Sequence, residues 1–314
     1  MKITKAQQIQ FLEILEKKKI HPVYQPIVSL SDGSIYGYEA LSRIDLPECS
    51  FNTEQMFKIA EKMKCVWELE SICRKKSIHN AVSKPKNTKL FINADPKVIH
   101  DSKFRSGVTA GYLKKYGMSP NDIVFEITER TSIEDAKTFK KSIEHYTKQN
   151  YKIAIDDFGS QYAGPDRLCQ LKPHIIKIDI AIIRDIDKDA FKRSFVKSMA
   201  VFGKTTDVKI LAEGIETREE LETLINLGID YGQGYYLAKP QSEFELENSE
   251  LSEEIIAMNN NLQQRTENSL LKFLEVSPEN TPISFSSEGK ELGTFTCGQF
   301  RDLLLQNNTH IEQF

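Results

Sequence analysis

The sequence predicts an α/β protein built on a (β/α)8 barrel in which one strand is antiparallel to the others. Three observations predict this fold. Between residues 84 and 240, short β-rich runs alternate with helical stretches rich in Lys and Glu, as in the crossover βα units of a parallel sheet. No glycine-rich phosphate loop follows the first run, which favours a closed barrel over a doubly wound sheet. An early hairpin signal supplies the antiparallel strand.

A helix and a hairpin precede the alternating region. The stretch TKAQQIQFLEILEKKK, residues 4–19, has its apolar residues at helical spacing and predicts an amphipathic helix. The runs HPVYQPIVSL and SIYGYEALSR flank the turn SDGS, a pattern typical of a β-hairpin. We therefore expect residues 21–43 to form a hairpin, which makes one barrel strand antiparallel.

The β-rich runs that follow are expected to form the parallel part of the barrel. Each is short, is rich in β-branched or aromatic residues and is followed by a helical stretch. The runs read TKLFINA, DIVFEITE, KIAIDDF, HIIKIDI, VKILAEGI and YGQGYYL.

The pattern changes after Pro240, and this change predicts the domain boundaries. Residues 1–242 are expected to hold the barrel, and residues 243–262 form an acidic helical linker. Residues 263–314 predict one helix, a weak strand pair around PISFSSEGKELGTFTC and a terminal helix. About fifty residues make a marginal core by themselves. We therefore interpret this part as a small α+β extension or a fragment of a second domain, with a regulatory or dimer-forming role.

Composition excludes several classes of function. A chain of 314 residues that is 39% hydrophobic buries a core large enough for an enzyme, and a net charge of -3 disfavours a polymeric nucleic-acid partner. The 5 cysteines form no CxxC pair, and their odd number argues against a disulfide framework and a thiolate zinc site. The first residues do not resemble a signal peptide, and no apolar run reaches membrane-spanning length. We expect a soluble, cytoplasmic protein without a membrane segment.

Polar side chains stand at the carboxyl end of each predicted strand. In a parallel barrel these ends share one face, where such enzymes place their chemistry. Five carboxylates together with amide groups and an ammonium therefore converge on one pocket, and such crowding raises carboxyl pKa values unless cations compensate it. The side chains are Glu39, Asn93, Glu126, Asp156, Asp157, Lys177, Glu213 and Gln233.

The ligand types point to hard divalent cations. Carboxylates and an Asn carbonyl oxygen, without His or Cys, suit Mg²⁺ or Mn²⁺ and suit structural Zn²⁺ poorly. The adjacent Asp156 and Asp157 provide for two ions, one residue bridging and the other terminal. A pair of ions about 3.5 to 4 Å apart is the usual arrangement for phosphodiester displacement.

Each signal has a simpler structural interpretation. The tetrapeptide DDFG is often only a turn, and the acidic residues of EITE, Glu126 and Glu129, also suit the first turn of a helix. Gly234 also suits close backbone packing, and the histidines show no ligand spacing. The functional interpretation depends on the recurrence of one acid or amide per strand over consecutive units.

At these residues the chain resembles the EAL domain, the cyclic di-GMP phosphodiesterase family, over residues of about 5 to 242. Eight motifs occur in the family's order. They read YQPIV (24–28), EALSR (39–43), FINADP (91–96), EITE (126–129), DDFG (156–159), KID (177–179), AEGIE (212–216) and QGYYLAKP (233–240). The resemblance implies a modified TIM barrel with one antiparallel strand, in agreement with the hairpin signal.

The resemblance implies roles for the matching residues. The first metal has the ligands Glu39, Asn93, Glu126 and Asp156, and the second ion is bound by the bridging Asp156 with Asp157 and Glu213. Lys177 lies near the attacking water and the phosphate, Asp157 or Glu213 helps to take the proton from water, and Glu129 steadies the loop after DDFG. The expected substrate-binding residues are Gln25, Arg43, Asp179, Glu216 and Gln233.

The implied reaction is hydrolysis of one phosphodiester bond of cyclic di-GMP to linear pGpG with two Mg²⁺ or Mn²⁺ ions. A homodimer is a further expectation from the family. The chain departs from the family pattern at three places: Gln161 replaces a common Gly, Gly164 and Pro165 replace a Ser-Leu pair, and Asp95 stands where Ser is commoner. These changes bear on loop closure and on the turnover rate.

Two other functions are open. A catalytically weak or inactive EAL domain acts as a cyclic di-GMP receptor, and another metal-dependent barrel enzyme, such as an enolase-like lyase, also needs clustered carboxylates. Receptors commonly lose a metal ligand or the loop glutamate, whereas every matched position is filled here. A lyase leaves Gln25, Arg43 and the ordered motifs unexplained. The sequence therefore favours the phosphodiesterase.

Overall fold

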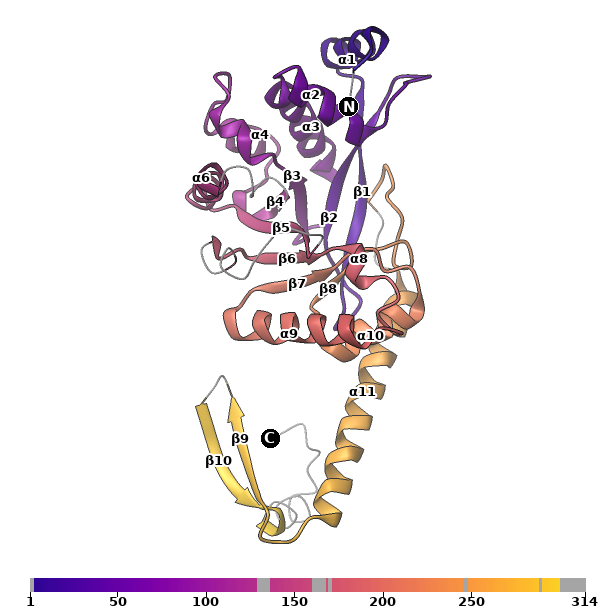
Figure 1. The fold of residues 1–314 in the computed structure, drawn as a ribbon, viewed down its shortest axis with the longest axis vertical. Helices are drawn as coiled ribbons and strands as arrows, with labels where there is room; N and C mark the ends of the chain where they lie inside the picture. Colours follow the sequence, from indigo (N-terminus) through magenta and orange to yellow (C-terminus); the bar gives the residue numbers. More distant parts are fainter. Residues whose placement is uncertain are drawn as a thin grey trace. The chain divides into compact units, whose positions relative to one another are not determined.

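The first part of the chain folds into a closed barrel of strands β1 to β8 (Figure 1). The strands are β1 (Ile20–Ser29), β2 (Ile35–Ile44), β3 (Lys89–Asn93), β4 (Ile123–Thr128), β5 (Lys152–Phe158), β6 (Ile175–Ile178), β7 (Lys209–Ala212) and β8 (Tyr231–Gly232). Strand β1 is antiparallel to β2 and to β8, and all other neighbouring pairs are parallel. The predicted barrel with one antiparallel strand is confirmed.

This computed structural model describes residues 3–128, 136–159, 168, 171–244, 248–287 and 290–299. The chain forms two units, Met1–Glu253 and Glu254–Phe314. Among the described residues, no helix is both long enough and apolar enough to cross a membrane.

Helices surround the barrel strands. Figure 1 shows α2, α3, α4 and α6 beside strands β1 to β5, whereas α9 lies beside β7. Among the described residues, this unit has the helices α1 (Lys5–Lys17), α2 (Thr53–Lys62), α3 (Val66–Asn80), α4 (Val108–Lys115), α6 (Ala136–Thr147), α8 (Ile180–Ile183), α9 (Ala190–Thr206) and α10 (Arg218–Leu227), with short 3₁₀ turns η1 (Ala81–Ser83), η2 (Pro96–His100) and η3 (Pro120–Asp122). The predicted N-terminal helix is α1, and a capping box between Thr4 and Gln7 satisfies its first backbone donors.

The inside of the barrel explains where the polar side chains lie. Apolar side chains of six strands form one buried cluster in the barrel. Because alternate residues of a strand face the same side, a residue two positions after a core residue also faces inward. Five such pairs occur: Phe91 and Asn93, Val124 and Glu126, Ala154 and Asp156, Ile175 and Lys177, and Leu211 and Glu213. The barrel core and the polar cluster are therefore consecutive layers on the same inner face.

The second unit contains most of a long helix and a hairpin. Helix α11 (Ser249–Val276) begins in the first unit and continues into the second. Strands β9 (Pro282–Ser287) and β10 (Lys290–Thr296) pair antiparallel, where the sequence indicates a weak strand pair. Residues 297–299 are helical, and the rest of the expected terminal helix lies outside the described residues. The boundaries at residues 242 and 262 stay predictions.

Candidate active site

The Lys177 ammonium lies at the centre of a carboxylate cluster in the mouth of the barrel. Its Nζ is 2.6 Å from an oxygen of Glu126, 2.6 Å from one of Glu213 and 2.8 Å from one of Asp156. A fourth carboxylate, that of Glu39, is 3.6 Å away. The Lys177 and Glu126 side chains are 1% and 0% exposed, so water contributes little to the screening of these charges. One positive charge here faces four acidic groups.

Burial and this crowding shift the pKa values of the cluster. Burial raises the pKa of Glu126 well above its ordinary value, and repulsion from Glu39 adds to the rise. Burial also raises the pKa of Glu213 well above its ordinary value, although the Lys177 ammonium opposes this. Burial alone would lower the pKa of Lys177, but its carboxylate neighbours outweigh burial and raise that pKa well above the ordinary value. The crowding of acidic groups is thus the dominant property of the site.

A bulge in β5 brings two consecutive aspartates to one cluster. In a regular strand Asp156 and Asp157 would face opposite sides. The pairing of β5 with β6 shifts register between Ile155 and Phe158, and Asp157 adopts a left-handed backbone with φ 56°. As a result, carboxylate oxygens of Asp156, Asp157 and Glu213 lie within 4.8 Å of one another.

Amide side chains complete the cluster. Asn93 Nδ2 donates to Glu39 over 3.2 Å and to Glu126 over 3.3 Å. Gln233 Nε2 donates to Glu39 over 2.8 Å and to Gln25 over 3.0 Å. Gln25 in turn donates to the Ala238 carbonyl oxygen. These bonds fix the orientation of the Glu39 carboxylate.

Close backbone packing positions Gln233. A Cβ atom at Gly234 would lie 2.1 Å from the Ile215 carbonyl oxygen, and Gln233 exchanges backbone hydrogen bonds with Ala212 and Ile215. Glycine is therefore required for the chain after β8 to approach the chain after β7. The close backbone packing at Gly234 therefore also holds the preceding residue, Gln233, in the site.

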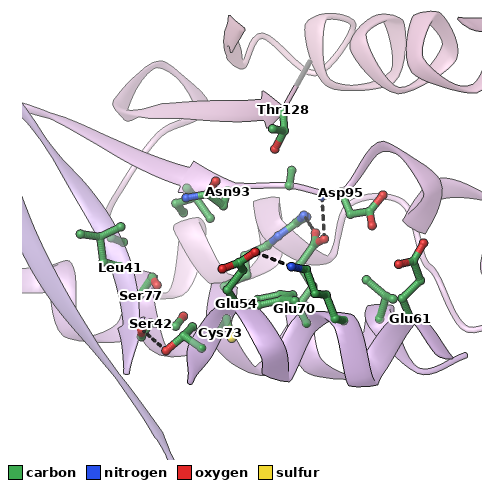
Figure 2. A pocket seen from close by; sticks show the side chains of 18 of the residues that line it. Leu41, Ser42, Glu54, Glu61, Glu70, Cys73, Ser77, Asn93, Asp95 and Thr128 are labelled. Atoms are coloured by element: carbon green, nitrogen blue, oxygen red, sulfur yellow. Dashed lines mark hydrogen bonds and ion pairs between the residues drawn. The ribbon is translucent and has the colours of Figure 1, made fainter. Parts of the chain in front are cut away.

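A pocket of about 530 Å³ opens beside the cluster. Arg43, Asn93 and Asp157 line it, and so do residues of α2 and α3. In Figure 2, Asn93 and Asp95 belong to the strand side of the pocket, and Glu70 belongs to the helix opposite. Pockets of about 300 to 1,000 Å³ are typical of small-molecule sites.

The structure brings most predicted site residues together, with three exceptions. Two of them have contacts outside the cluster, and the third is not among the described residues. Asp179 follows β6, and its side chain accepts a hydrogen bond from the Ala181 backbone at the start of α8. Glu216 is 41% exposed and pairs with Arg184. Glu129 lies outside the described residues, as do Gln161, Gly164 and Pro165. The roles expected for all these residues stay predictions.

Sequence reasoning missed two pocket residues. Glu70 and Arg74 of α3 form a buried ion pair that lines the pocket. Burial raises the pKa of Glu70 to about 7, although Arg74 opposes this rise. An i,i+4 pair of opposite charge usually marks an exposed helix face. The sequence signal that could have identified them is their place in α3 on the same helical side as the apolar Trp67 and Ile78.

The donor set fits hard divalent cations. Its carboxylate and amide oxygens are the ligands of Mg²⁺, Mn²⁺ and Ca²⁺, and the single ammonium leaves several acidic charges uncompensated. The clustered oxygens of Asp156, Asp157 and Glu213 are suitable for one ion. Glu39, Asn93 and Glu126 extend the donor set on the side of β2 to β4.

Comparison with known proteins agrees with this geometry. The model of the EAL domain matches residues 7–240. Probable cyclic di-GMP phosphodiesterase PdeA of Escherichia coli is 36% identical over 129 residues, which are 41% of this chain and 18% of PdeA. The bifunctional diguanylate cyclase/cyclic di-GMP phosphodiesterase MucR of Pseudomonas aeruginosa is 28% identical over 250 residues, 76% of this chain and 36% of MucR. The chain thus spans only a minor part of these relatives.

A solved structure supports the same assignment. Klebsiella pneumoniae BlrP1, in a complex with manganese and cyclic di-GMP, has a TM-score of 0.65 and 26% sequence identity. The match covers 71% of this chain and 56% of BlrP1. The range matched by the family model contains every strand of the barrel and the whole carboxylate cluster. The chain belongs to the EAL domain family.

Proposed function

We propose that this chain hydrolyses one phosphodiester bond of cyclic di-GMP and releases linear pGpG. The observation that carries the proposal is the group of four carboxylates around Lys177 at the mouth of the barrel. The names of the relatives PdeA and MucR and the cyclic di-GMP in the BlrP1 complex support the choice of substrate.

The residues that would hold the ions follow from the donor set. Glu39, Asn93, Glu126 and Asp156 are proposed for one Mg²⁺ or Mn²⁺, and Asp156, Asp157 and Glu213 for the other. Bound divalent cations would supply the positive charge that activates a water molecule and neutralises charge on the phosphate. With the carboxylates compensated in this way, the Lys177 ammonium is available to donate to a phosphate oxygen.

The reaction balances as an in-line displacement. The water oxygen forms a bond to phosphorus, the bond from phosphorus to the 3′-oxygen breaks, and the product is a 5′-phosphate and a 3′-hydroxyl. Asp157 or Glu213 accepts a proton from the water, and the leaving 3′-oxygen takes up a proton from the solvent. Arg43 lines the pocket and is proposed to pair with a phosphate through its guanidinium.

The experiment compares cleavage of labelled cyclic di-GMP with Mn²⁺ and with a chelator. Wild-type chain is expected to yield pGpG only with the cation. Glu39→Ala removes a proposed ligand and the acceptor of both Asn93 and Gln233, so we expect at least a hundredfold loss of turnover. Glu222→Gln on α10 is the matched control, because Glu222 forms a solvent-accessible ion pair with Arg218 and has no proposed role at the site, and it should retain full activity.

Three outcomes would contradict the proposal. Tight binding of the dinucleotide without cleavage in either Mg²⁺ or Mn²⁺ would identify a receptor. Cleavage that persists in chelator, or at an unchanged rate in Glu39→Ala, would show that the carboxylate cluster is not the reaction centre.

We also propose that the chain forms a homodimer through α9. Phe191 is 90% exposed, Phe195 is 39% exposed, and the two are one helical turn apart on the same face. Exposed aromatic pairs of this kind are typical of protein interfaces.

Light scattering at micromolar concentration tests the dimer. Wild-type chain should have twice the monomer mass, and Phe191→Glu should reduce it to the monomer mass. Ile9→Glu on α1 is the control, because Ile9 is also exposed, at 68%. A monomeric wild-type chain, or a Phe191→Glu variant that stays dimeric, would refute this interface.

A further inference from the structure

The buried ion pair between Glu70 and Arg74 in α3 has no role in the reaction described above. The two side chains are 4% and 2% exposed and line the pocket. Burying two charges is costly, and a buried ion pair contributes little net stability compared with apolar side chains of the same size. Its place beside the proposed metal ligands suggests another role.

Glu70 connects α3 to the segment that carries Asn93. One carboxylate oxygen, Oε2, accepts the backbone N–H of Asp95 over 2.9 Å (Figure 2), and the other pairs with Arg74. Asp95 is two residues after Asn93, and the Ala94 N–H between them donates to the Glu126 carbonyl oxygen. The backbone of residues 93–95 is thus held from two sides, by α3 and by β4.

Arg74 is itself held rigidly. Its guanidinium donates to Thr109 Oγ1 and to the Tyr146 hydroxyl, each over 3.1 Å. It also lies 4.7 Å from the centre of the Phe125 ring, and Phe125 directly precedes Glu126 in β4. A group with contacts to α4, α6 and β4 has little freedom to move, so it fixes the Glu70 carboxylate in turn.

We propose that Glu70 is a positioning residue that holds the backbone of residues 93–95 so that the Asn93 side chain faces the divalent cation. Asn93 already contacts Glu39 and Glu126 through its amide, and a half-turn of that amide presents Oδ1 in place of Nδ2. The inference rests on the metal assignment of the proposed function. Arg74 acts through Glu70 by fixing its carboxylate.

The test separates positioning from stability. In the double variant Glu70→Leu with Arg74→Met, apolar side chains replace the ion pair, so the fold is expected to keep a melting temperature near that of the wild type. The Asp95 N–H nevertheless loses its acceptor. We expect Mn²⁺, titrated without dinucleotide and followed by electron paramagnetic resonance, to bind at least tenfold more weakly.

Two variants serve as controls. Leu224→Ala in α10 removes a fully buried side chain that does not line the pocket and should lower the melting temperature while Mn²⁺ affinity stays within threefold of wild type. Glu70→Leu alone leaves Arg74 buried without its partner, and it should lose both stability and Mn²⁺ affinity.

Clear outcomes would overturn the inference. A stable double variant that binds Mn²⁺ within threefold of wild type would show that Glu70 does not position the ligand. An equal loss of affinity in Leu224→Ala would show that general destabilisation explains the effect. A wild-type chain that binds Mn²⁺ but leaves cyclic di-GMP intact would refute the proposed reaction and would leave this inference standing. A wild-type chain that binds no Mn²⁺ would overturn both the proposed reaction and this inference.

Discussion

At the scale of single residues, Lys177 has two opposing effects on the site. Its ammonium compensates part of the negative charge of Glu126, Asp156 and Glu213, and this holds the carboxylates together without a cation. The same contacts compete with cations for the carboxylate oxygens. The lysine therefore stabilises the metal-free barrel and opposes metal binding.

Replacing Lys177 tests the first effect. Lys177→Met leaves the buried carboxylates without their counter-charge, so we expect the free energy of unfolding in chelator to fall by about 3 to 5 kcal/mol. Urea denaturation with and without Mn²⁺ measures it, and the loss should be smaller with Mn²⁺. Lys58→Met is the control, because the exposed pair of Lys58 and Glu54 contributes less than about 1 kcal/mol. An equal loss in chelator and in Mn²⁺ would contradict this account.

The sequence predicted the residues of the cluster because polar side chains stand at the carboxyl ends of the predicted strands, and five of them follow a core residue by two positions. It could not predict the burial of Arg74, which depends on Tyr146, a residue 72 positions later in the chain. The local contact of Asp179 was also missed, because whether its side chain faces the pocket or caps α8 depends on where that helix begins. Spacing identifies which residues share a face, whereas packing partners from distant elements decide which charges are buried.

At the scale of elements, the alternation of strands and helices was sufficient to predict the barrel. The alternation was less informative about the residues at which individual strands begin and end. The run YGQGYYL predicts a strand over residues 231–237, but β8 contains only Tyr231–Gly232. The rest turns because Gly234 packs against the Ile215 backbone, a contact with the chain after β7. The bulge in β5 could not be predicted either, because the residues DDFG carry no signal that distinguishes a bulge from an ordinary turn.

Regular β5 geometry would have divided the site. With strict alternation, Asp157 would point away from the barrel interior, and the three-carboxylate group with Asp156 and Glu213 would not form. The left-handed backbone at Asp157 is a conformation that Asp tolerates better than most residues. The bulge is therefore the local feature of β5 that makes adjacent aspartates useful to one site.

At the scale of the whole molecule, the net charge is small although acidic groups outnumber basic groups at the site. The chain carries 42 basic and 45 acidic residues, yet several of the acidic side chains are gathered in one cluster, in which Glu39 and Glu126 are buried. The pKa values of Glu126 and Glu213 are raised well above their ordinary value by burial, and that of Glu70 is raised to about 7. The folded, metal-free protein therefore binds protons that the unfolded chain releases.

This imbalance sets the pH dependence of stability. A carboxyl group whose folded pKa exceeds its unfolded value of about 4.5 stabilises the fold fully at low pH and loses that contribution as pH rises through the folded pKa. Cations bind the deprotonated carboxylates and reverse the loss. We thus expect the increase in melting temperature caused by Mn²⁺ to be small at pH 5.5 and to grow steadily up to pH 8.

The difference between melting temperatures with Mn²⁺ and with chelator isolates this effect. The pKa values of His145 and His174 are lowered by burial, so these groups favour the fold as pH rises, but they contribute equally with and without the cation. Leu224→Ala should show a lower melting temperature and the same growth of the Mn²⁺ increment. If the increase in melting temperature caused by Mn²⁺ stayed constant or became smaller with rising pH, the carboxylates of the cluster would not exchange protons for cations. The charge imbalance would then have to be compensated within the protein itself.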